Sequence, residues 1–403
     1  MHDTAYRRLR RRAVGFFHDA DDRIHRARAE RRRVVIEAAS PMNEAILRPI
    51  YQRLACDPRV ELCFTTPAGV WRPEQVFGSA GPPGKQVPAS SSAWMKADAY
   101  VNADFWDMTW LHRRTRRIHL FHGVAGKYGL DAPTQIAPIV ANFDCLMFVN
   151  ADRRTRYIEA GLTPDDEVRA ALVGYPKVDC LVDGSLDRVT ILRGLGLDPG
   201  IPTIIYAPTW SPYSSLNAMG EAIIDAIAAE GLQVIVKLHD RSYDRAERGS
   251  GGIDWAARLS RFESQPRIRI ARAADGSPFL AAADAMVSDH SSIAFEYMLL
   301  DRPIVVIDCP ELLVRAAISP DKVRRLRCAA DVVQDADEMI RALVPALKDP
   351  DRLTVERRRI ARELFHEPGT ATLRALQLIY RLIDLPAPVG QPVEQGCAVG
   401  AAG

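Results

Sequence analysis

Two histidines each follow a short apolar stretch that is typical of a buried strand. His122 comes directly after residues 118–121, and His239 follows residues 233–236 with Lys237 and Leu238 between. A histidine at the carboxyl end of a strand is well placed to act as a general base near neutral pH. His239 could equally donate a hydrogen bond to a phosphate or protonate a leaving group. Either histidine alone could simply bond to its own loop, but two in equivalent positions favour chemistry.

A segment of small polar residues follows a third apolar stretch and precedes a helix. Residues 288–292 read SDHSS, after the strand expected at 285–288. Backbone N–H groups and the helix dipole make such an N-terminus a site for anions. The hydroxyls of Ser291 and Ser292 would add donors to a phosphate, although serines also cap helices routinely. Glu296, one turn later, could accept hydrogen bonds from ribose hydroxyls or lie at the surface.

Two further segments have a weaker signal for anion binding. Residues 206–210 read YAPTW, in which Thr209 can touch a phosphate and Trp210 can line a ligand site or pack. Residues 366–372 read HEPGTAT, which fits an anion cradle before a helix or an ordinary helix cap at Thr370.

The sequence lacks the motifs of several common enzyme classes. It has no Walker loop, no G-x-G-x-x-G after a strand, no H-E-x-x-H and no convincing metal-binding D-x-D. These motifs hold phosphates, dinucleotides and zinc. NAD chemistry, ATP hydrolysis and zinc chemistry are therefore disfavoured, and we expect no metal.

The elements that position these residues form two successive α/β alternations. Strands are expected at 33–38, 60–64, 99–102, 118–121, 145–149 and 170–173, and then at 203–207, 233–237, 268–270, 285–288 and 304–307, with helices at 43–55, 219–230 and 292–300. Alternation of this kind predicts parallel sheets covered by helices. Ligands of such doubly wound sheets bind at the carboxyl ends of the strands, where the candidate residues lie.

Length and composition agree with two domains. The chain has 403 residues, of which 47% are hydrophobic and 26% charged, with a net charge of +2. A chain of this length exceeds one ordinary core. We expect a basic segment at 1–32, Rossmann-like domains at 33–185 and 200–365, a closing helix at 366–384 and a disordered tail at 385–403.

Cysteine usage and hydropathy indicate the compartment. The seven cysteines are an odd number, widely spaced and without a C-x-x-C. That pattern favours a reducing compartment over a disulfide framework. The N-terminus has no apolar signal region, and no apolar run approaches the roughly 20 residues of a membrane span. We therefore expect a cytoplasmic protein.

The order of the motifs resembles the CDP-glycerol glycerophosphotransferase family. The shared features are HG with a following lysine at 122–127, YAPTW at 206–210, KLH at 237–239, SDxSS at 288–292, FE at 295–296, RPI at 302–304 and the late G-x-A at 369–371. The resemblance covers roughly residues 99–383. It implies a GT-B architecture, with an N-terminal acceptor domain and a C-terminal nucleotide-donor domain.

The resemblance also implies a reaction and roles for residues. Glycerol phosphate would pass from CDP-glycerol to an acceptor hydroxyl, with release of CMP, during synthesis of a teichoic-acid-like or capsule polymer. His122 would be the base, and His239 would contact the donor diphosphate. The remaining donor-binding candidates are Lys127, Thr209, Ser288, Asp289, Ser291, Ser292 and Glu296. Fixed donors of this kind can stabilise the charge in phosphoryl transfer, so we expect no cofactor and no nucleic-acid partner.

Three segments depart from the family pattern and leave the donor open. Val124-Ala125 replaces a Thr-Pro pair, Asp240 replaces a proline, and His290 replaces a tyrosine. CDP-ribitol or a similar polyol donor therefore remains an alternative. A UDP-sugar glycosyltransferase or epimerase would share the fold, and so would a non-catalytic binding protein.

The N-terminal basic segment suggests a place for the reaction. Residues 7–33 are rich in arginine, with Val14-Gly15-Phe16-Phe17 between two basic blocks. A basic helix with a few large apolar residues can lie on an anionic membrane, although a solvated helix or arm fits as well. A lipid-linked acceptor would make contact with the inner face of the membrane useful.

Overall fold

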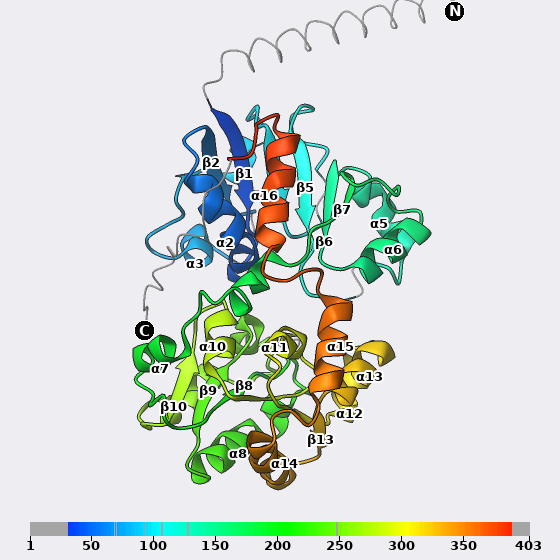
Figure 1. Cartoon of the computed structure of the whole chain (residues 1–403). Helices are drawn as coiled ribbons and strands as arrows, with labels where there is room; N and C mark the ends of the chain where they lie inside the picture. The colour runs from blue at the N-terminus through cyan, green and yellow to red at the C-terminus, as the bar shows by residue number, and fades with distance from the viewer. Residues whose placement is uncertain are drawn as a thin grey trace, which may run out of the picture.

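The computed structural model describes residues 31–388, with gaps at residues 68, 70, 93, 106–107, 127–128 and 247–248. The basic segment at 1–30, most of the expected tail and Lys127 lie outside the described residues. The chain forms two α/β halves, one above the other in Figure 1.

The first half is built on a parallel sheet of seven strands in the order β3-β2-β1-β4-β5-β6-β7. Its strands are β1 (Arg32–Glu37), β2 (Val60–Thr65), β3 (Lys85–Gln86), β4 (Ala99–Asn102), β5 (Arg116–Leu120), β6 (Cys145–Phe148) and β7 (Ala170–Leu172). The order reverses between β1 and β4. This reversal, here called the first switch point, is where doubly wound sheets bind ligands.

The second half repeats the plan with six parallel strands in the order β10-β9-β8-β11-β12-β13. They are β8 (Thr203–Tyr206), β9 (Gln233–Lys237), β10 (Ile268–Ala271), β11 (Ala285–Ser288), β12 (Ile304–Ile307) and β13 (Asp331–Val333). The second switch point lies between β8 and β11. Every residue of β8, β9, β11 and β12 is buried, as expected for strands covered on both faces.

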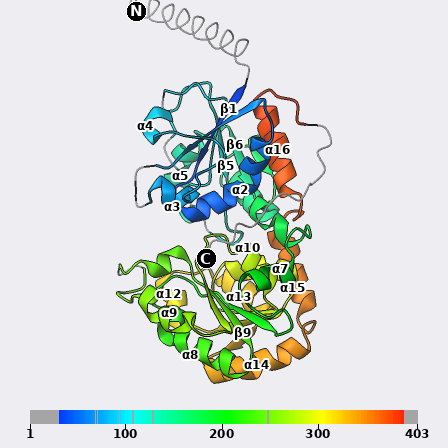
Figure 2. The same cartoon turned by 90° about the vertical axis from the view of Figure 1, so that its left-hand side faces the viewer.

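Helices cover the two sheets (Figures 1 and 2). The first half has α2 (Pro41–Ala55), α3 (Pro73–Phe77), α4 (Ala89–Ser92), α5 (Pro133–Val140) and α6 (Ala151–Glu159), followed by the 3-10 turn η1 (Pro176–Leu181). Helix α7 (Arg188–Gly194) lies with the second half in Figure 1. The second half has α8 (Ser215–Ala229), η2 (Asp240–Tyr243), α9 (Trp255–Glu263), α10 (Ser277–Ala282), α11 (Ile293–Tyr297), η3 (Met298–Leu300), α12 (Pro310–Arg315), α13 (Pro320–Cys328) and α14 (Ala336–Lys348).

Two helices of the first half begin at short polar residues that cap them. Ser40 accepts from the backbone N–H of Asn43 at the start of α2, and Asn150 accepts from that of Arg153 at the start of α6. Such caps satisfy backbone donors that the first helical turn leaves without a partner. These two strand-to-helix junctions are therefore specified locally by the sequence.

The C-terminal part of the chain returns to the first half. Helix α15 (Thr354–Leu364) packs on the second half, and α16 (Ala371–Leu382) lies beside α2 in both views (Figures 1 and 2). At the crossing, Gly174 has a φ of 91°, and a Cβ there would lie 2.5 Å from the carbonyl oxygen of His366. Only glycine fits this close approach without strain.

Apolar packing joins the halves. One buried cluster contains Phe121 of the first half, Phe295 of the second and Ile379 of α16. Among the described residues, no helix is both long and apolar enough to cross a membrane.

Candidate active site

His122 follows β5 and is held in one orientation. Its Nδ1 lies 2.9 Å from the carbonyl oxygen of Ala103, in the loop after β4. A carbonyl can only accept, so Nδ1 carries the proton and the neutral ring has its lone pair on Nε2. Burial lowers the pKa of His122 below its ordinary value, which keeps the ring neutral at pH 7. This is the protonation state that a general base requires.

Arg153 of α6 and Asn150, the residue that caps this helix, shape the turn that carries His122. Arg153 is buried, and its guanidinium donates to the carbonyl of Gly123 at 2.6 Å while lying 5.3 Å from the centre of the Phe121 ring. The Asn150 amide donates to the carbonyls of Val124 and Leu364 at 3.1 and 3.0 Å. The loop of the candidate base is thereby tied to α6 and to the end of α15.

Asp104 adds a negative charge near His122. After burial, which lowers the pKa of His122, the Asp104 carboxylate is the largest influence and raises it. Asp104 directly follows Ala103, whose carbonyl binds the imidazole. A carboxylate in this place stabilises the imidazolium that forms when a base takes up a proton. Nothing in the sequence around Asp104 distinguishes it, and only the return of β5 beside β4 brings it to His122.

A buried polar chain lies at the first switch point. Glu37, at the end of β1, accepts from the hydroxyl of Tyr100 and from the amide of Asn102, the latter at 3.3 Å. The Asn102 Oδ1 lies 3.2 Å from Nδ1 of His119, whose ring stacks on Phe105 with centroids 4.3 Å apart. These contacts fix both ends of the loop 102–105 that binds His122.

His239 is fixed by a different contact. Its Nδ1 accepts from the backbone N–H of Arg241 at 3.1 Å, so the neutral ring carries its proton on Nε2. Burial, and then the charges of Lys237 and Arg241, lower the pKa of His239 to about 4. The Arg241 guanidinium in turn lies over the ring of Trp210, 4.7 Å from its centre. His239 therefore offers a neutral N–H donor at neutral pH.

Glu296 lies in a buried ion pair between the halves. Its Oε2 accepts from Nζ of Lys177, in η1, at 2.5 Å. Burial opposes the charge on Lys177, but the Glu296 carboxylate outweighs it and holds the pKa of Lys177 above its ordinary value. A second ion pair, between Arg48 of α2 and Asp275 at 3.6 Å, also joins the halves. The sequence alone gave no sign of either contact.

The carboxylate of Asp289 accepts four hydrogen bonds at the second switch point. One carboxylate oxygen accepts from the backbone N–H and the hydroxyl of Thr209, at 2.8 and 2.5 Å. The other accepts from the backbone N–H and the hydroxyl of Ser215, both at 3.1 Å. The structure thus brings together two of the expected donor-binding residues, Thr209 and Asp289, through a direct bond between them. Direct contact of either with a donor stays a prediction.

The three serines and the aspartate of the SDHSS segment differ in their exposure to solvent. Ser288 and Asp289 are fully buried, and the Ser288 hydroxyl donates to the carbonyl of Ala207 at 2.6 Å. Ser291 is partly exposed, and Ser292 is exposed at the start of α11. Of the four, Ser291 and Ser292 are open to a ligand, whereas Ser288 and Asp289 hold the surrounding loops.

The segment 366–372 is occupied by a group of the protein itself. Both carboxylate oxygens of Asp179, in η1, accept from backbone N–H groups there, with distances of 2.8 Å to Gly369, 3.2 Å to Ala371 and 2.7 Å to Thr372. Thr370 does not cap the helix with its side chain. The expected cradle is therefore an internal carboxylate cap that anchors α16, with no place for a phosphate.

Within the described ranges, no group of three or more His, Cys, Asp and Glu side chains could hold a metal.

The fold and the histidines at the ends of its strands define a transferase of the GT-B class, with two Rossmann-like domains. The model of the family described as CDP-Glycerol:Poly(glycerophosphate) glycerophosphotransferase matches residues 84–381. The chain therefore belongs to this family, and its activity is the transfer of glycerol phosphate from CDP-glycerol. The resemblance drawn from the sequence motifs is confirmed. No curated protein matches the chain.

Solved structures with this fold include two kinds of enzyme. The wall teichoic acid polymerase TagF aligns with a TM-score of 0.64 and 15% identity, over 88% of this chain and 90% of that one. A putative UDP-N-acetylglucosamine 2-epimerase from Listeria monocytogenes aligns with a TM-score of 0.57 and 14% identity, over 89% and 98%. At these identities the likeness shows the fold alone, and it confirms the expected GT-B class. The UDP-sugar alternative is not better supported than the family activity.

Proposed function

We propose that this chain transfers glycerol phosphate from CDP-glycerol to the terminal hydroxyl of a lipid-linked acceptor, in the synthesis of a teichoic-acid-type polymer. The observation that carries the proposal is the orientation of His122, because the bond from Nδ1 to the Ala103 carbonyl leaves the lone pair on Nε2. A solved TagF structure was soaked with CDPG, which fits the same donor class.

In the proposed reaction, Nε2 of His122 takes the proton of the acceptor hydroxyl. The acceptor oxygen attacks the phosphorus that carries glycerol, and the bond from that phosphorus to the bridging oxygen breaks, which releases CMP. Negative charge builds up on the phosphate oxygens, where fixed donors are most effective. We assign that role to Nε2–H of His239, to the partly exposed Ser291 and to the exposed Ser292, with Lys127 in support.

The remaining candidate residues of the donor site would hold its loops in place or contact the ribose. We propose that Ser288, Asp289 and Thr209 shape the loops around the diphosphate through their mutual bonds. Glu296, whose Oε2 is held by Lys177, would present Oε1 to the ribose.

We place the reaction in the cytoplasm at the inner face of the membrane, supported by the basic composition of residues 7–33. Removal of residues 1–30 should then abolish binding to anionic vesicles.

The test is donor selectivity. Purified full-length protein would be titrated with CDP-glycerol, CDP-ribitol, UDP-N-acetylglucosamine and UDP-glucose, and nucleotide release would be measured with a crude lipid fraction as acceptor. We expect binding of CDP-glycerol and release of CMP. Release of CMP from CDP-ribitol but not from CDP-glycerol would show that the transferred group is ribitol phosphate. A response only to a UDP-sugar would refute the proposal.

A further inference from the structure

Among the described residues, Trp94 has the most exposed of the large apolar side chains. Its exposed fraction is 87%, against 78% for Val314 of α12. Trp94 lies between α4 and β4 in the first half. Tryptophan combines a large apolar ring with an N–H donor, which suits the boundary between an apolar phase and water. A single exposed apolar side chain is common in proteins, so its surroundings decide what it means.

Segment 94–98, which leads into β4, lies beside the start of β5. The Thr115 hydroxyl donates to the carbonyl of Ala97 at 3.0 Å. The backbone N–H of Arg116 donates to the carbonyl of Asp98, also at 3.0 Å. Segments 94–98 and 112–116 therefore form one continuous surface at the amino ends of β4 and β5.

This surface is basic. Its cations are wholly or partly exposed: Lys96, Arg113 and Arg116. Asp98, an acid of the same surface, is buried and accepts from the guanidinium of Arg114 at 2.9 Å. Asp144 lies 3.7 Å from the guanidinium of Arg116 and is only partly exposed. The surface around Trp94 therefore presents more positive than negative charge to solvent.

The N-terminal basic segment joins the described chain at the same edge of the sheet. Strands β1 and β4 are parallel neighbours, and the backbone N–H of Arg33 donates to Oδ2 of Asp98 at 2.9 Å. The start of β1 lies at the end of the first half that faces away from the second half (Figure 1). Residues 1–30, whose composition is also basic, precede this point.

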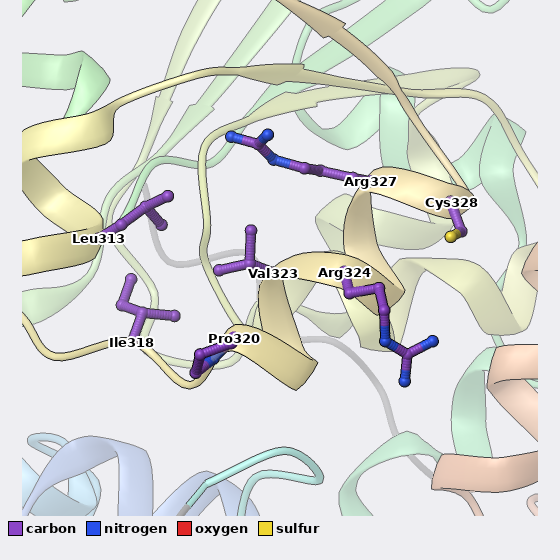
Figure 3. Close-up of a pocket in the computed structure, with 7 residues that line it drawn as sticks. All are labelled: Leu313, Ile318, Pro320, Val323, Arg324, Arg327 and Cys328. Atoms are coloured by element: carbon purple, nitrogen blue, oxygen red, sulfur yellow. The ribbon is translucent and has the colours of Figure 1, made fainter.

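The groove between α12 and α13 also combines apolar side chains with arginines (Figure 3). Its Arg324 pairs with Asp321 at 2.5 Å, and its Arg327 pairs with Asp308 at 2.6 Å. The groove belongs to the second half, whereas both ends of the described chain lie in the first half. This part of the second half therefore offers a control for the surface around Trp94.

We propose that the surface around Trp94, formed by segments 94–98 and 112–116, docks on an anionic lipid bilayer. The inference rests on the proposed function, which places the reaction at a membrane but assigns the contact to the N-terminal segment alone. The Trp94 ring lies among the lipid headgroups, and the surrounding cations meet lipid phosphates. One weak contact gives only marginal binding, so the surface and the segment act together.

Docking in this place leaves the candidate active site open. Arg116 begins β5, and His122 follows its other end. The rise of the strand separates the two residues by roughly 20 Å. Binding of CDP-glycerol at the carboxyl ends of the strands is therefore independent of the bilayer, and changes at the surface should leave it unaltered.

The first test compares full-length wild type with Trp94→Ser, Trp94→Phe and a control, Val314→Ser, which removes another highly exposed apolar side chain. Sedimentation with vesicles of phosphatidylcholine and phosphatidylglycerol measures the affinity. We expect Trp94→Ser to bind about tenfold more weakly, because it no longer buries a large aromatic ring. Trp94→Phe should lose less, and Val314→Ser should bind like the wild type.

The second test removes charge from the same surface. In the double variant Arg113→Gln, Arg116→Gln, binding to vesicles that contain phosphatidylglycerol should weaken about fivefold for each charge removed. Binding to vesicles of phosphatidylcholine alone should not change. Added salt should reduce the difference between the double variant and the wild type, because it screens exposed charges.

Quenching of tryptophan fluorescence by lipids with brominated acyl chains tests the contact directly. The wild type should lose a component of its emission that Trp94→Phe lacks. Equal quenching in the two proteins would overturn the proposal, since Trp94 would then face residues 1–30 or solvent. Equal vesicle affinities of Trp94→Ser and the wild type, or an equal loss in Val314→Ser, would also overturn it.

Failure of the proposed function gives a different result. If CDP-glycerol yields no CMP, the proposed activity is refuted, and vesicle binding still decides the role of Trp94. If CMP is released but Trp94→Ser binds vesicles like the wild type, only the docking surface is refuted. If the wild type does not bind anionic vesicles, the docking surface and the proposed place of the reaction are both refuted, and the donor test stands.

Discussion

The two halves have the same strand order but use their switch points differently. In each, a buried carboxylate lies where the order reverses: Glu37 at the end of β1 and Asp289 just after β11. Glu37 bonds to side chains of the neighbouring strand β4, and its contacts continue to His119. Asp289 instead bonds to the loop after β8 and to the start of α8. The first arrangement fixes strand ends beside His122, and the second fixes the loops around the SDHSS segment.

The largest expected effect is on the base of the first half. His122→Ala should lower kcat by roughly 10²–10⁴-fold, the usual contribution of a general base. Donor affinity, measured by titration with CDP-glycerol, should change little, because the donor candidates other than Lys127 lie in the second half. If His122→Ala keeps most of its kcat, then His122 is not the general base, and the proposal that the first half supplies the base and the second half binds the donor is refuted.

The two carboxylates can be compared directly. Each carboxylate oxygen of Asp289 accepts two hydrogen bonds, one oxygen from Thr209 and the other from Ser215. In Asp289→Asn an NH2 group replaces one of these oxygens, so the two donors of either Thr209 or Ser215 lose their acceptor. The free energy of unfolding should fall by about 1–3 kcal/mol, and KM for the donor should rise. Urea denaturation and steady-state kinetics measure both quantities.

The matching change in the first half is Glu37→Gln. Because Glu37 supports the loop that binds His122, this variant should lower kcat and leave KM for the donor unchanged. Identical kinetic patterns in the two variants would show that the switch points do not have separate roles.

A smaller effect should follow from removing the charge next to the base. The Asp104 carboxylate raises the pKa of His122, so Asp104→Asn should shift the acid limb of the pH–rate profile to lower pH. The plateau should drop by about threefold to tenfold, since one pKa unit corresponds to 1.36 kcal/mol. Asp152→Asn, on the exposed side of α6, is the control. A drop in rate without a shift of the limb would indicate a structural role for Asp104.

The smallest effect concerns stability in acid. His239 has a pKa of about 4 in the folded chain against an ordinary value of 6.5. Below pH 6.5 the unfolded chain therefore binds a proton that the folded chain does not, and stability falls until about pH 4. His239→Gln should remove about 1 kcal/mol of this loss. Urea denaturation at several pH values measures the free energy of unfolding of both proteins. An equal loss of this free energy between pH 7 and pH 4 in the wild type and in His239→Gln would contradict the expectation.

The strands were predictable because buried parallel strands are continuous apolar runs. Those expected at 99–102, 233–237, 285–288 and 304–307 match β4, β9, β11 and β12 residue for residue. Elements without such runs were missed. The segment 67–92, in which no strand or helix was expected, contains α3, β3 and α4, and β13 has only three residues. Short elements of this kind are stabilised by their neighbours and carry little signal of their own.

The sequence by itself determined the fold class, the family and the places of His122, His239 and the SDHSS segment, because local patterns fix strands and the turns that follow them. Tertiary structure decided what those residues contact. Asp179 caps a helix about 190 residues away, Lys177 pairs with Glu296 across the halves, and Asp289 reaches back to Thr209. Such contacts depend on how separate elements pack, and a carboxylate looks the same in the sequence whether it meets a ligand or a backbone N–H.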